Sequence, residues 1–287
     1  MTTATPPVTR KPRDDEIDIH ALTHQGRVRI TNQDHFLLAS VHRRVQIVST
    51  SLSDRERLPF GDERLAYVIM VADGVGGGNA GERASATALE IATQYVVSSM
   101  NCYYSQDSTE ADFINALQAA AMKCHEEVVE RAKGDPDLTR MATTLTMLMG
   151  VWPWYYLLQV GDSRYYLFRD GKLRQMTRDQ TIAQDLLDQG VFTAAVARRS
   201  RFSNVLSSSI GGEQTEPRIT RLPQDWNNVH LLCSDGLTKH VSDERIAERL
   251  GSMTSAREAC ELLLQDALED GGTDNITIVI ARATPKD

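Results

Sequence analysis

Four aspartates in this chain share one local setting, at an end of a strand-like apolar segment. Asp73 is the clearest case, because it closes the apolar run of residues 66–72 and is followed by a glycine-rich turn. The other three are Asp162, Asp235 and Asp274. A charge at the end of a buried strand is costly unless something neutralises it. Each aspartate alone could be an ordinary turn or capping residue, but four in one setting indicate a carboxylate cluster.

A carboxylate cluster of this kind predicts a divalent metal site. Two carboxylates about 5 Å apart repel each other by roughly 3 kcal/mol at an effective dielectric constant of about 20, so the cluster persists only if cations fill it. The candidate ligands are all oxygen, with no His or Cys at the neighbouring positions, which favours Mg²⁺ or Mn²⁺ over Zn²⁺. The glycine after Asp73 lets a backbone carbonyl, that of Gly74, join the ligands.

Such a metal site is suited to the hydrolysis of phosphate esters. Two divalent cations a few ångströms apart can activate a bridging water and clamp a phosphoryl oxygen. Arg29, in the polar segment of residues 29–34, would supply the bidentate grip on a phosphate that carboxylates lack. These residue types therefore predict a metal-assisted phosphoryl hydrolase.

The glycine-rich turn also fits a different pattern. Gly76, Gly78 and Gly81 satisfy G-x-G-x-x-G between a strand and a helix, which is the fingerprint of dinucleotide binding. However, Asp73 would repel a pyrophosphate unless a cation stood between them, and no second strand ending in Asp or Glu follows about 20 residues later. No Gly-Lys-Ser/Thr sequence follows, which argues against a P-loop. Both nucleotide-binding interpretations are therefore disfavoured.

The composition is that of an ordinary globular protein, with 41% hydrophobic and 24% charged residues among 287. The net charge of −8 argues against nucleic acid as the main partner. The four cysteines show no C-x-x-C spacing and are expected to be core residues in a reducing cytoplasm. The longest apolar stretch, residues 147–160, is too short to span a membrane and is broken by Pro153. We expect a cytoplasmic protein with no membrane segment.

Hydrophobic periodicity predicts a chain of short strands and helices. Strands are expected at residues 17–22, 36–41, 45–49, 66–72, 143–151, 155–160, 164–169, 172–176, 229–233 and 276–281, with the second and third forming a hairpin. Helices are expected at residues 82–97, 109–133, 182–189, 243–250 and 256–268, with capping boxes at Thr109 and Ser255. Tight turns between the short strands indicate antiparallel sheets.

Six motifs bring these observations together, and in their order and approximate spacing they resemble the protein phosphatase 2C (PPM) family. The resemblance covers residues 17–281 and is greatest to bacterial serine/threonine phosphatases that oppose Hanks-type kinases. The motifs are Arg29-x-x-Asn32-Gln33-Asp34, Asp73-Gly74-x-Gly76-Gly77, Thr143-Thr144-Leu145, Gly161-Asp162-Ser163-Arg164, Ser234-Asp235-Gly236 and Asp274-Asn275.

The resemblance implies an α+β fold, a four-layer αββα sandwich in which two central antiparallel sheets are flanked by helix pairs. It implies one catalytic domain over residues 16–283, followed by a short tail at residues 284–287. The composition of residues 1–15, rich in Thr, Pro, Lys and Arg with no apolar stretch, predicts a disordered N-terminal tail. The segment of residues 178–212 corresponds to a mobile flap. Three flap arginines could meet a phosphopeptide, although a solvated loop is an equal alternative; they are Arg198, Arg199 and Arg201.

The resemblance also assigns roles to single residues. Asp73 would bridge two Mn²⁺ or Mg²⁺ ions, the carbonyl of Gly74 would bind one of them, and Asp235 and Asp274 would hold the other side. Asp162, together with Asp235, resembles a third metal site. Asp34 would orient the attacking water and Arg29 would hold the substrate phosphate. The implied substrates are phosphoserine and phosphothreonine in proteins, with a kinase and its substrates as partners.

Two positions depart from the family pattern. Gln33 stands where the family usually has Glu, which removes a negative charge near the metals. Val75 stands where animal members have His, so no side chain at this position can protonate the leaving group. Bacterial members also tend to have an apolar residue at the position of Val75, so Gln33 alone keeps a second interpretation open, a weakly active or inactive phosphatase-like module that binds phosphoproteins. The retained aspartates and Arg29 favour the enzyme, because a pure binder has no need of a full metal set.

Overall fold

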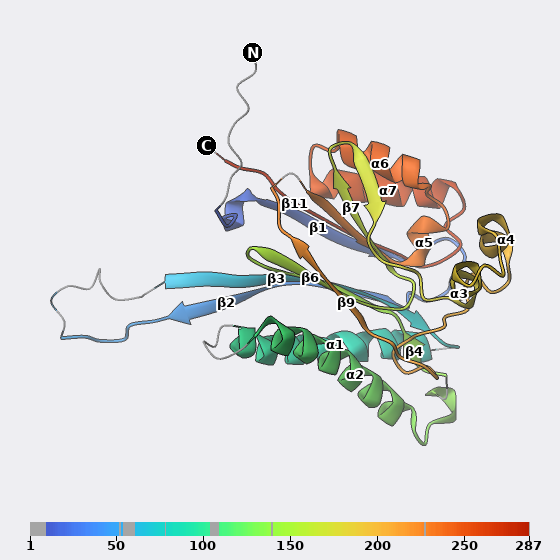
Figure 1. Ribbon diagram of the computed structural model, residues 1–287, viewed down its shortest axis with the longest axis horizontal. Coiled ribbons are helices and arrows are strands. Elements are labelled where there is room, and N and C mark those ends of the chain that lie inside the picture. Colours follow the sequence, from blue (N-terminus) through green and yellow to red (C-terminus); the bar gives the residue numbers. More distant parts are fainter. Residues whose placement is uncertain are drawn as a thin grey trace, which may run out of the picture.

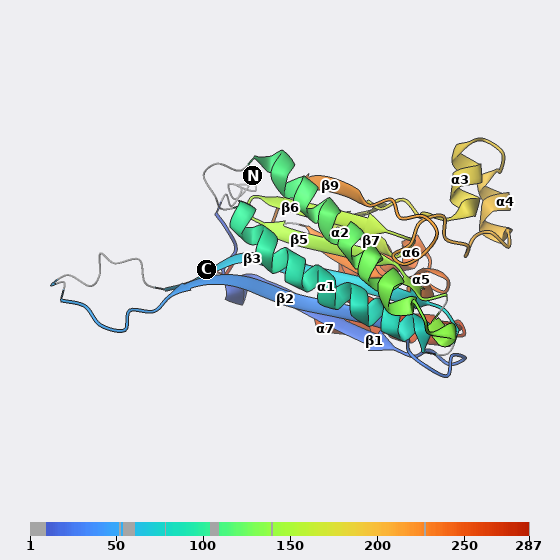
Figure 2. The same cartoon turned by 90° about the horizontal axis from the view of Figure 1, so that it is seen from below.

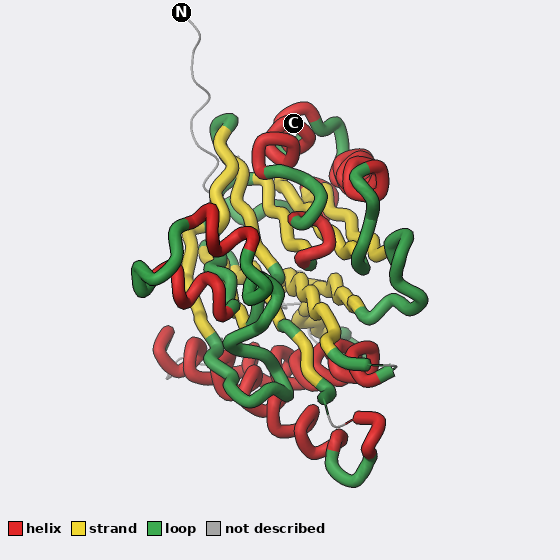
Figure 3. Tube along the Cα trace, turned by 90° about the vertical axis from the view of Figure 1, so that its right-hand side faces the viewer, coloured by secondary structure: helices red, strands yellow, loops and turns green. Residues whose placement is uncertain are grey.

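The computed structural model describes residues 10–51, 53, 61–77, 79–103, 109–138, 140–226 and 228–286. In this part of the chain the strands form two antiparallel sheets that pack face to face, and helices cover the outer face of each sheet (Figure 1). Seen from one end, the layers stack as helix, sheet, sheet and helix (Figure 3). The expected αββα sandwich is confirmed.

The first sheet has the strand order β1-β11-β10-β7-β8. Its members are β1 (Ile17–His24), β7 (Arg164–Arg169), β8 (Lys172–Gln175), β10 (Val229–Cys233) and β11 (Ile276–Ala283). Its outer face is covered by the short helix α5 (Asp235–Thr238) and by α6 (Asp243–Ser252) and α7 (Ala256–Glu269). The hydroxyl of Ser255 accepts a hydrogen bond from the Glu258 backbone N–H, so the predicted cap of α7 is confirmed.

The second sheet has the order β2-β3-β5-β6-β9, with β4 paired to the end of β3. Its members are β2 (Asp34–Val45), β3 (Gly61–Val75), β4 (Ala142–Thr143), β5 (Leu145–Val151), β6 (Trp154–Val160) and β9 (Arg218–Pro223). The long helices α1 (Ala80–Tyr103) and α2 (Glu110–Ala132) lie across its outer face (Figure 2). Thr109 and Asp112 form the predicted capping box at the start of α2.

Strand β3 is buried on both faces, as its continuous apolar sequence predicts. Val68 and Met70 belong to the core beneath α1 and α2, whereas Ile69 and Val71 belong to the core between the sheets. All four side chains are at most 4% exposed. The strand therefore lies at the centre of the fold, and it delivers Asp73 to one end of the sandwich.

A two-helix excursion stands at that same end (Figure 1). It lies between β8 and β9 and contains α3 (Ile182–Asp188) and α4 (Ala194–Arg199). An isolated bridge between Thr181 and Leu206 closes the base of this segment, and a second bridge, between Thr143 and Ile210, joins it to the end of β4. This segment corresponds to the flap predicted at residues 178–212, and we call it the flap below.

The predicted hairpin of residues 36–49 is wrong. Strand β2 is continuous from Asp34 to Val45 and pairs with β3, as far as Val45 opposite Gly61, in a ribbon that projects beyond the sandwich (Figure 1). The polar residues 42–44 interrupt the apolar pattern because they lie exposed on this projecting part. Strand β9 was missed because its burial pattern alternates between half-buried and exposed residues, which gives a weak apolar signal.

The predicted N-terminal tail begins to pack earlier than residue 16. Residues 1–9 lie outside the described residues, but the Arg10 guanidinium pairs with Glu16 at 2.7 Å and lies over the Trp226 ring. Asp14–Glu16 form a short 3₁₀ helix, and the Glu16 side chain is fully buried. The Arg10–Glu16 pair compensates the buried carboxylate within this segment. Residues 10–16 are held to the body by Arg64, which pairs with Asp14, and by Trp226, whose Nε1 donates to the Arg10 carbonyl at 3.1 Å.

Candidate active site

The first half of the site is the open end of the β2–β3 ladder. Asp34 and Asp73 are directly paired there. The Asp73 backbone is held by Thr144, whose hydroxyl accepts from the Asp73 N–H at 2.9 Å. Thr143 donates its hydroxyl to the Asp73 carbonyl at 2.8 Å. The Thr143-Thr144 pair therefore fixes the backbone that carries the Asp73 carboxylate.

Gly74 is required by close backbone contact rather than by a positive φ. A Cβ on this residue would lie 2.1 Å from the Gly81 carbonyl oxygen and 2.7 Å from that of Gln33. Strand β3 and the start of α1 can meet only because no side chain stands there. The side-chain amide of Gln33 donates to the Gly76 carbonyl at 3.3 Å, so Gln33 lies against this glycine turn.

The second half of the site comes from the first sheet. Ser234 follows β10 and donates its hydroxyl to Asp34 Oδ2 at 2.6 Å, and Thr277 on β11 donates to the same oxygen at 2.8 Å. Asp34 is 3% exposed. These two hydroxyls therefore join the sheets through one buried carboxylate and align Asp73 with Asp235.

Asp162 enters the site from the turn after β6. The preceding residue, Gly161, has φ +101°, a conformation that disfavours other residues, and a Cβ there would lie 2.6 Å from the Thr144 side chain. Asp162 is 9% exposed, and its charge acts on both Asp73 and Asp235. The predicted carboxylates Asp34, Asp73, Asp162, Asp235 and Asp274 are thus brought into one electrostatic cluster.

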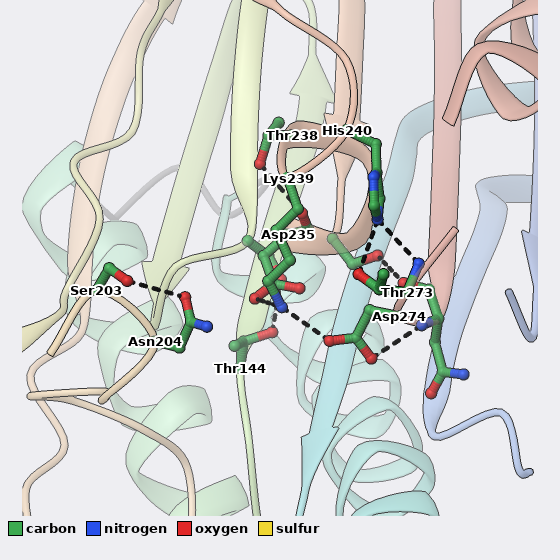
Figure 4. Close-up of polar contacts among 12 residues, drawn as sticks. Thr144, Ser203, Asn204, Asp235, Thr238, Lys239, His240, Thr273 and Asp274 are labelled. Atoms are coloured by element: carbon green, nitrogen blue, oxygen red, sulfur yellow. Dashed lines mark hydrogen bonds and ion pairs between the residues drawn. The ribbon is translucent and has the colours of Figure 1, made fainter. Parts of the chain in front are cut away.

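Two side-chain cations touch this cluster. The Arg29 guanidinium pairs with both oxygens of Asp274, at 2.7 and 2.9 Å. The Lys239 ammonium lies between Asp235 and Asp274, at 2.6 and 2.8 Å (Figure 4). Among the described residues, the five carboxylates therefore have two side-chain cations in direct contact, and the charge of Arg164 also acts on Asp162.

The electrostatic consequence is a set of carboxyl groups that hold their protons unusually well. Burial, reinforced by the neighbouring carboxylates, raises the pKa of Asp34 to about 7 and that of Asp162 to about 8. The same causes raise the pKa of Asp73 well above its ordinary value. Burial also tends to raise the pKa of Asp274, but the hydrogen bonds from Arg29 and Lys239 lower it below the usual range.

The donor set fits a divalent cation. Oδ1 of Asp34 and Oδ1 of Asp235 are buried and have no hydrogen-bond partner. Buried carboxylate oxygens without a partner are costly, and they are hard ligands of the kind that Mg²⁺ and Mn²⁺ prefer. Among the residues that the structure describes, no three His, Cys, Asp or Glu side chains already form a metal cage. Asp235 and Asp274 turn toward Lys239 instead.

A cavity of about 650 Å³ opens beside the carboxylates and beneath the flap. Asp162, Asp235 and Lys239 line it from the sandwich, and Arg198 and Asn204 line it from the flap. Of the three flap arginines named from the sequence, Arg198 alone is among the lining residues; Arg199 is the last residue of α4, and Arg201 stacks on Phe202. The space can admit a substrate side chain to the carboxylate cluster.

The sequence reasoning missed several residues that build the site. Lys239 lies four residues after Asp235, a helical spacing that could have indicated an ion pair. Ser234 was noted in its motif without a role, and Thr277 was not noted. Asn275 was noted in its motif, and its side chain turns out to link the carbonyls of Gln25 and Thr31. Only the packing of the two sheets shows what these polar groups hold.

The raised pKa values predict a fall in stability with pH when no metal is present. A carboxyl group with a higher pKa in the folded state binds its proton more tightly there, so stability is lost as pH rises through that pKa. His230, whose pKa is lowered to about 4 by burial, has the opposite effect, but this effect is complete near pH 6.5. With chelator present, melting curves between pH 6.5 and 8 should therefore show a loss of about 1 to 3 kcal/mol.

The matched variants of this pH experiment are Asp162→Asn and Asp62→Asn. Asp162→Asn should shrink the fall, because it removes one of the shifted groups. Asp62 is exposed at the far end of β3, so Asp62→Asn should leave the fall intact. A melting temperature that is flat or rising across this pH range in the metal-free wild type would contradict the proton assignment.

Comparisons with known proteins identify the family of the chain. A sequence profile described as protein phosphatase 2C matches residues 54–270. The chain belongs to the protein phosphatase 2C family. It is 34% identical over 239 residues to the serine/threonine protein phosphatase PstP of Mycobacterium tuberculosis, and this alignment covers 82% of this chain and 45% of PstP. It is 30% identical over 214 residues to the serine/threonine phosphatase stp of Listeria monocytogenes, which covers 74% of this chain and 83% of stp.

Solved phosphatase 2C structures are also similar. The crystal structure of M. tuberculosis PstP superposes with a TM-score of 0.74 at 30% identity, over 94% of this chain and 99% of that one. A structure of the PstP catalytic domain in complex with two manganese ions gives a TM-score of 0.72 at 30% identity, with the same coverage of both chains. The chain therefore spans the crystallised domain but about half the length of PstP itself.

The family match divides the candidate residues of this phosphatase 2C chain into two groups. Asp73, Asp162 and Asp235 lie inside the matched residues 54–270. Arg29, Asp34 and Asp274 lie outside them, so their places in the site rest on the contacts described above. No helix among the described residues has the length and apolar character needed to cross a membrane.

Proposed function

We propose that this phosphatase 2C chain hydrolyses phosphoserine and phosphothreonine in proteins, with Mn²⁺ or Mg²⁺ as cofactor. The observation that carries the proposal is the excess of buried and partly buried carboxylates over the cations in contact with them, with the partnerless Oδ1 atoms of Asp34 and Asp235 in the cluster. A site that only recognised phosphate would need cations, whereas this one repels anions until divalent metal is bound. The names of the relatives and the manganese in the PstP structure support the same reaction.

The proposed ligands are Asp73, the Gly74 carbonyl, Asp235 and Asp274, with Asp162 and Asp235 for a third ion. When bound, the metal ions supply an acidified water and a clamp for a phosphoryl oxygen. Asp34 acts as a positioning residue, because its hydrogen bonds to Ser234 and Thr277 hold the two sheets in register at the ligands. Arg29 is half-exposed, with 53% of its side chain accessible, and its guanidinium can turn to a phosphate that enters from solvent.

The remaining parts of the proposal concern the setting of the reaction. The partners would be phosphorylated proteins, among them a kinase and the substrates of that kinase. A cytoplasmic location is supported by the free, buried thiols of Cys124, Cys233 and Cys260. Of the three flap arginines, Arg198 is the best placed to meet a phosphopeptide, since it lines the cavity.

The experiment that tests the proposal is phosphatase activity with and without metal. The purified chain should hydrolyse p-nitrophenyl phosphate and a phosphothreonine peptide with Mn²⁺, and lose this activity in chelator. The rival function, a phosphoprotein-binding module, predicts peptide binding without turnover at any Mn²⁺ concentration. Full turnover by a metal-free preparation would refute the metal mechanism itself.

Arg29→Ala should chiefly weaken substrate binding. If the guanidinium holds the phosphate equally in the ground and transition states, its loss raises KM by about 10- to 100-fold and changes kcat little. The KM of Arg29→Lys should lie between those of wild type and Arg29→Ala, because an ammonium group cannot make the bidentate contact with phosphate. Steady-state kinetics with the phosphothreonine peptide measure both constants. A loss confined to kcat would assign Arg29 to the transition state, and unchanged kinetics would remove it from the site.

A further inference from the structure

Lys239 is placed where a metal ion would be expected. It is the C-cap residue of α5, four residues after Asp235, and its ammonium reaches Asp235 at 2.6 Å and Asp274 at 2.8 Å. Figure 4 shows the side chain turned inward between the two carboxylates. The side chain is 27% exposed, and the two carboxylates are 18% and 16% exposed. The contact is therefore an ion-pair bridge that is largely shielded from solvent.

The charges of this bridge show what it does for the cluster. Asp235 and Asp274 come from the two chain segments that approach each other at the end of the first sheet, α5 and the head of β11. Without a cation between them their like charges would repel, and one ammonium removes part of that repulsion. It does not satisfy the whole site, since Oδ1 of Asp235 has no partner even with Lys239 in place.

We propose that Lys239 is an internal cation that competes with the divalent metal for Asp235 and Asp274. The inference rests on the proposed function, because it assumes that these two carboxylates are metal ligands. Its consequence is a site with two states. In the metal-free state the ammonium bridges the carboxylates and stabilises the fold. In the metal-bound state the divalent cation replaces it, because two positive charges cannot share the same carboxylate oxygens without strong repulsion.

The displaced ammonium has a place to go. Lys239 lines the 650 Å³ cavity beneath the flap, and so do Asp243 and Glu244 at the start of α6. A lysine side chain that swings away from the metals therefore enters a polar space with acidic neighbours. This exit keeps the cost of displacement moderate, so Lys239 lowers metal affinity without preventing binding.

Direct metal-binding measurements on three variants test the proposal. Lys239→Gln removes the positive charge of the bridge, and Lys239→Arg keeps it. The control, Lys172→Gln, removes a positive charge at the turn between β7 and β8, which lies at the other end of β7 from Asp162. Mn²⁺ dissociation constants, measured on metal-free protein by electron paramagnetic resonance, should fall about tenfold in Lys239→Gln, a change that corresponds to about 1.4 kcal/mol. Lys239→Arg and Lys172→Gln should stay within about twofold of wild type.

Melting temperatures give an independent readout. Without metal, Lys239→Gln should melt below wild type, because two facing carboxylates lose their shared counter-charge. With saturating Mn²⁺ the melting temperatures of wild type and Lys239→Gln should converge. The rise in melting temperature that Mn²⁺ causes is therefore larger in the variant. Equal dissociation constants and equal shifts in wild type and Lys239→Gln would overturn the proposal. So would a change in KM for the phosphopeptide with an unchanged Mn²⁺ dissociation constant, which would make Lys239 a phosphate ligand.

A third readout uses the wild-type chain and needs no variant. Reductive methylation followed by peptide mass spectrometry should modify Lys239 slowly in chelator and several-fold faster with Mn²⁺, with Lys172 as the internal reference. A methylation rate that does not change with Mn²⁺ would contradict displacement. These outcomes are separate from the failure of the proposed function, because wild type that binds no Mn²⁺ at millimolar concentration would refute the metal site itself.

Discussion

Asp73→Asn should lower kcat by about two to four orders of magnitude while the fold is retained. Asp73 is the carboxylate that the other four all act upon, and its backbone is fixed by Thr143 and Thr144. The substitution keeps the shape of the side chain and removes one negative charge from the cluster. Because like charges surround Asp73, the metal-free variant should melt at the same temperature as wild type or higher near pH 7.5.

The control for Asp73→Asn lies on the same strand. Asp62 is exposed on β3, where it pairs with His42 far from the cluster. Asp62→Asn changes the net charge equally and should leave kcat unchanged. Steady-state kinetics at saturating Mn²⁺ and melting curves in chelator separate the two predicted effects. Wild-type rates in Asp73→Asn would mean that the carboxylate cluster has a structural role only.

The parts of the fold that sequence predicted are those with a strong local signal. The continuous apolar run of β3 indicated burial on both faces, and Val68 to Val71 are indeed divided between two cores. The capping box at Thr109 and the N-cap at Ser255 located the starts of α2 and α7, although the Glu258 carboxylate accepts from Thr254 and so does not complete the capping box predicted at Ser255. Such signals succeed because the chemistry that makes them acts between neighbours in sequence.

The parts of the fold that the sequence did not predict depend on contacts between residues that are distant in the sequence. The outer end of β2 is charged, and only its pairing with β3 makes it a strand. Helix α5 is one turn long, and it forms where Asp235 must meet the head of β11. Neither the ribbon nor this single turn carries an apolar period of its own, so no pattern in the sequence could have revealed them.

The candidate site divides in the same way. Four of the five aspartates could be named from the sequence because each stands at a strand end next to a turn residue, whereas Asp34 was named from the resemblance to the phosphatase 2C family. The residues that align these aspartates could not be named from the sequence. The Ser234 and Thr277 hydroxyls donate hydrogen bonds to Asp34 from 200 and 243 positions away in the sequence. Lys239 belongs to this second group, because its bridge to Asp274 spans 35 positions.

Gly236→Ala should be among the most damaging single substitutions in the chain. A Cβ on Gly236 would lie 1.9 Å from the Asn275 carbonyl oxygen, far inside any tolerable contact. Asn275 cannot yield, because its amide donates to the carbonyls of Gln25 and Thr31 and its side-chain oxygen accepts from the Gln33 N–H. We expect a loss of about 3 kcal/mol or more in the free energy of unfolding, or roughly 10 °C in melting temperature.

The same clash should reach the chemistry. Gly236 follows Asp235 and Asn275 follows Asp274, so any shift that relieves the contact moves the two carboxylates apart. At assay temperatures below 25 °C, where the variant is still folded, its activity should therefore be lower than that of wild type. The Mn²⁺ concentration needed for its half-maximal rate should be higher. Gly77→Ala is the matched control, because a Cβ on Gly77 meets nothing within 4 Å. If Gly236→Ala melted and turned over like Gly77→Ala, α5 and the head of β11 would not be in the close contact that brings Asp235 to Asp274.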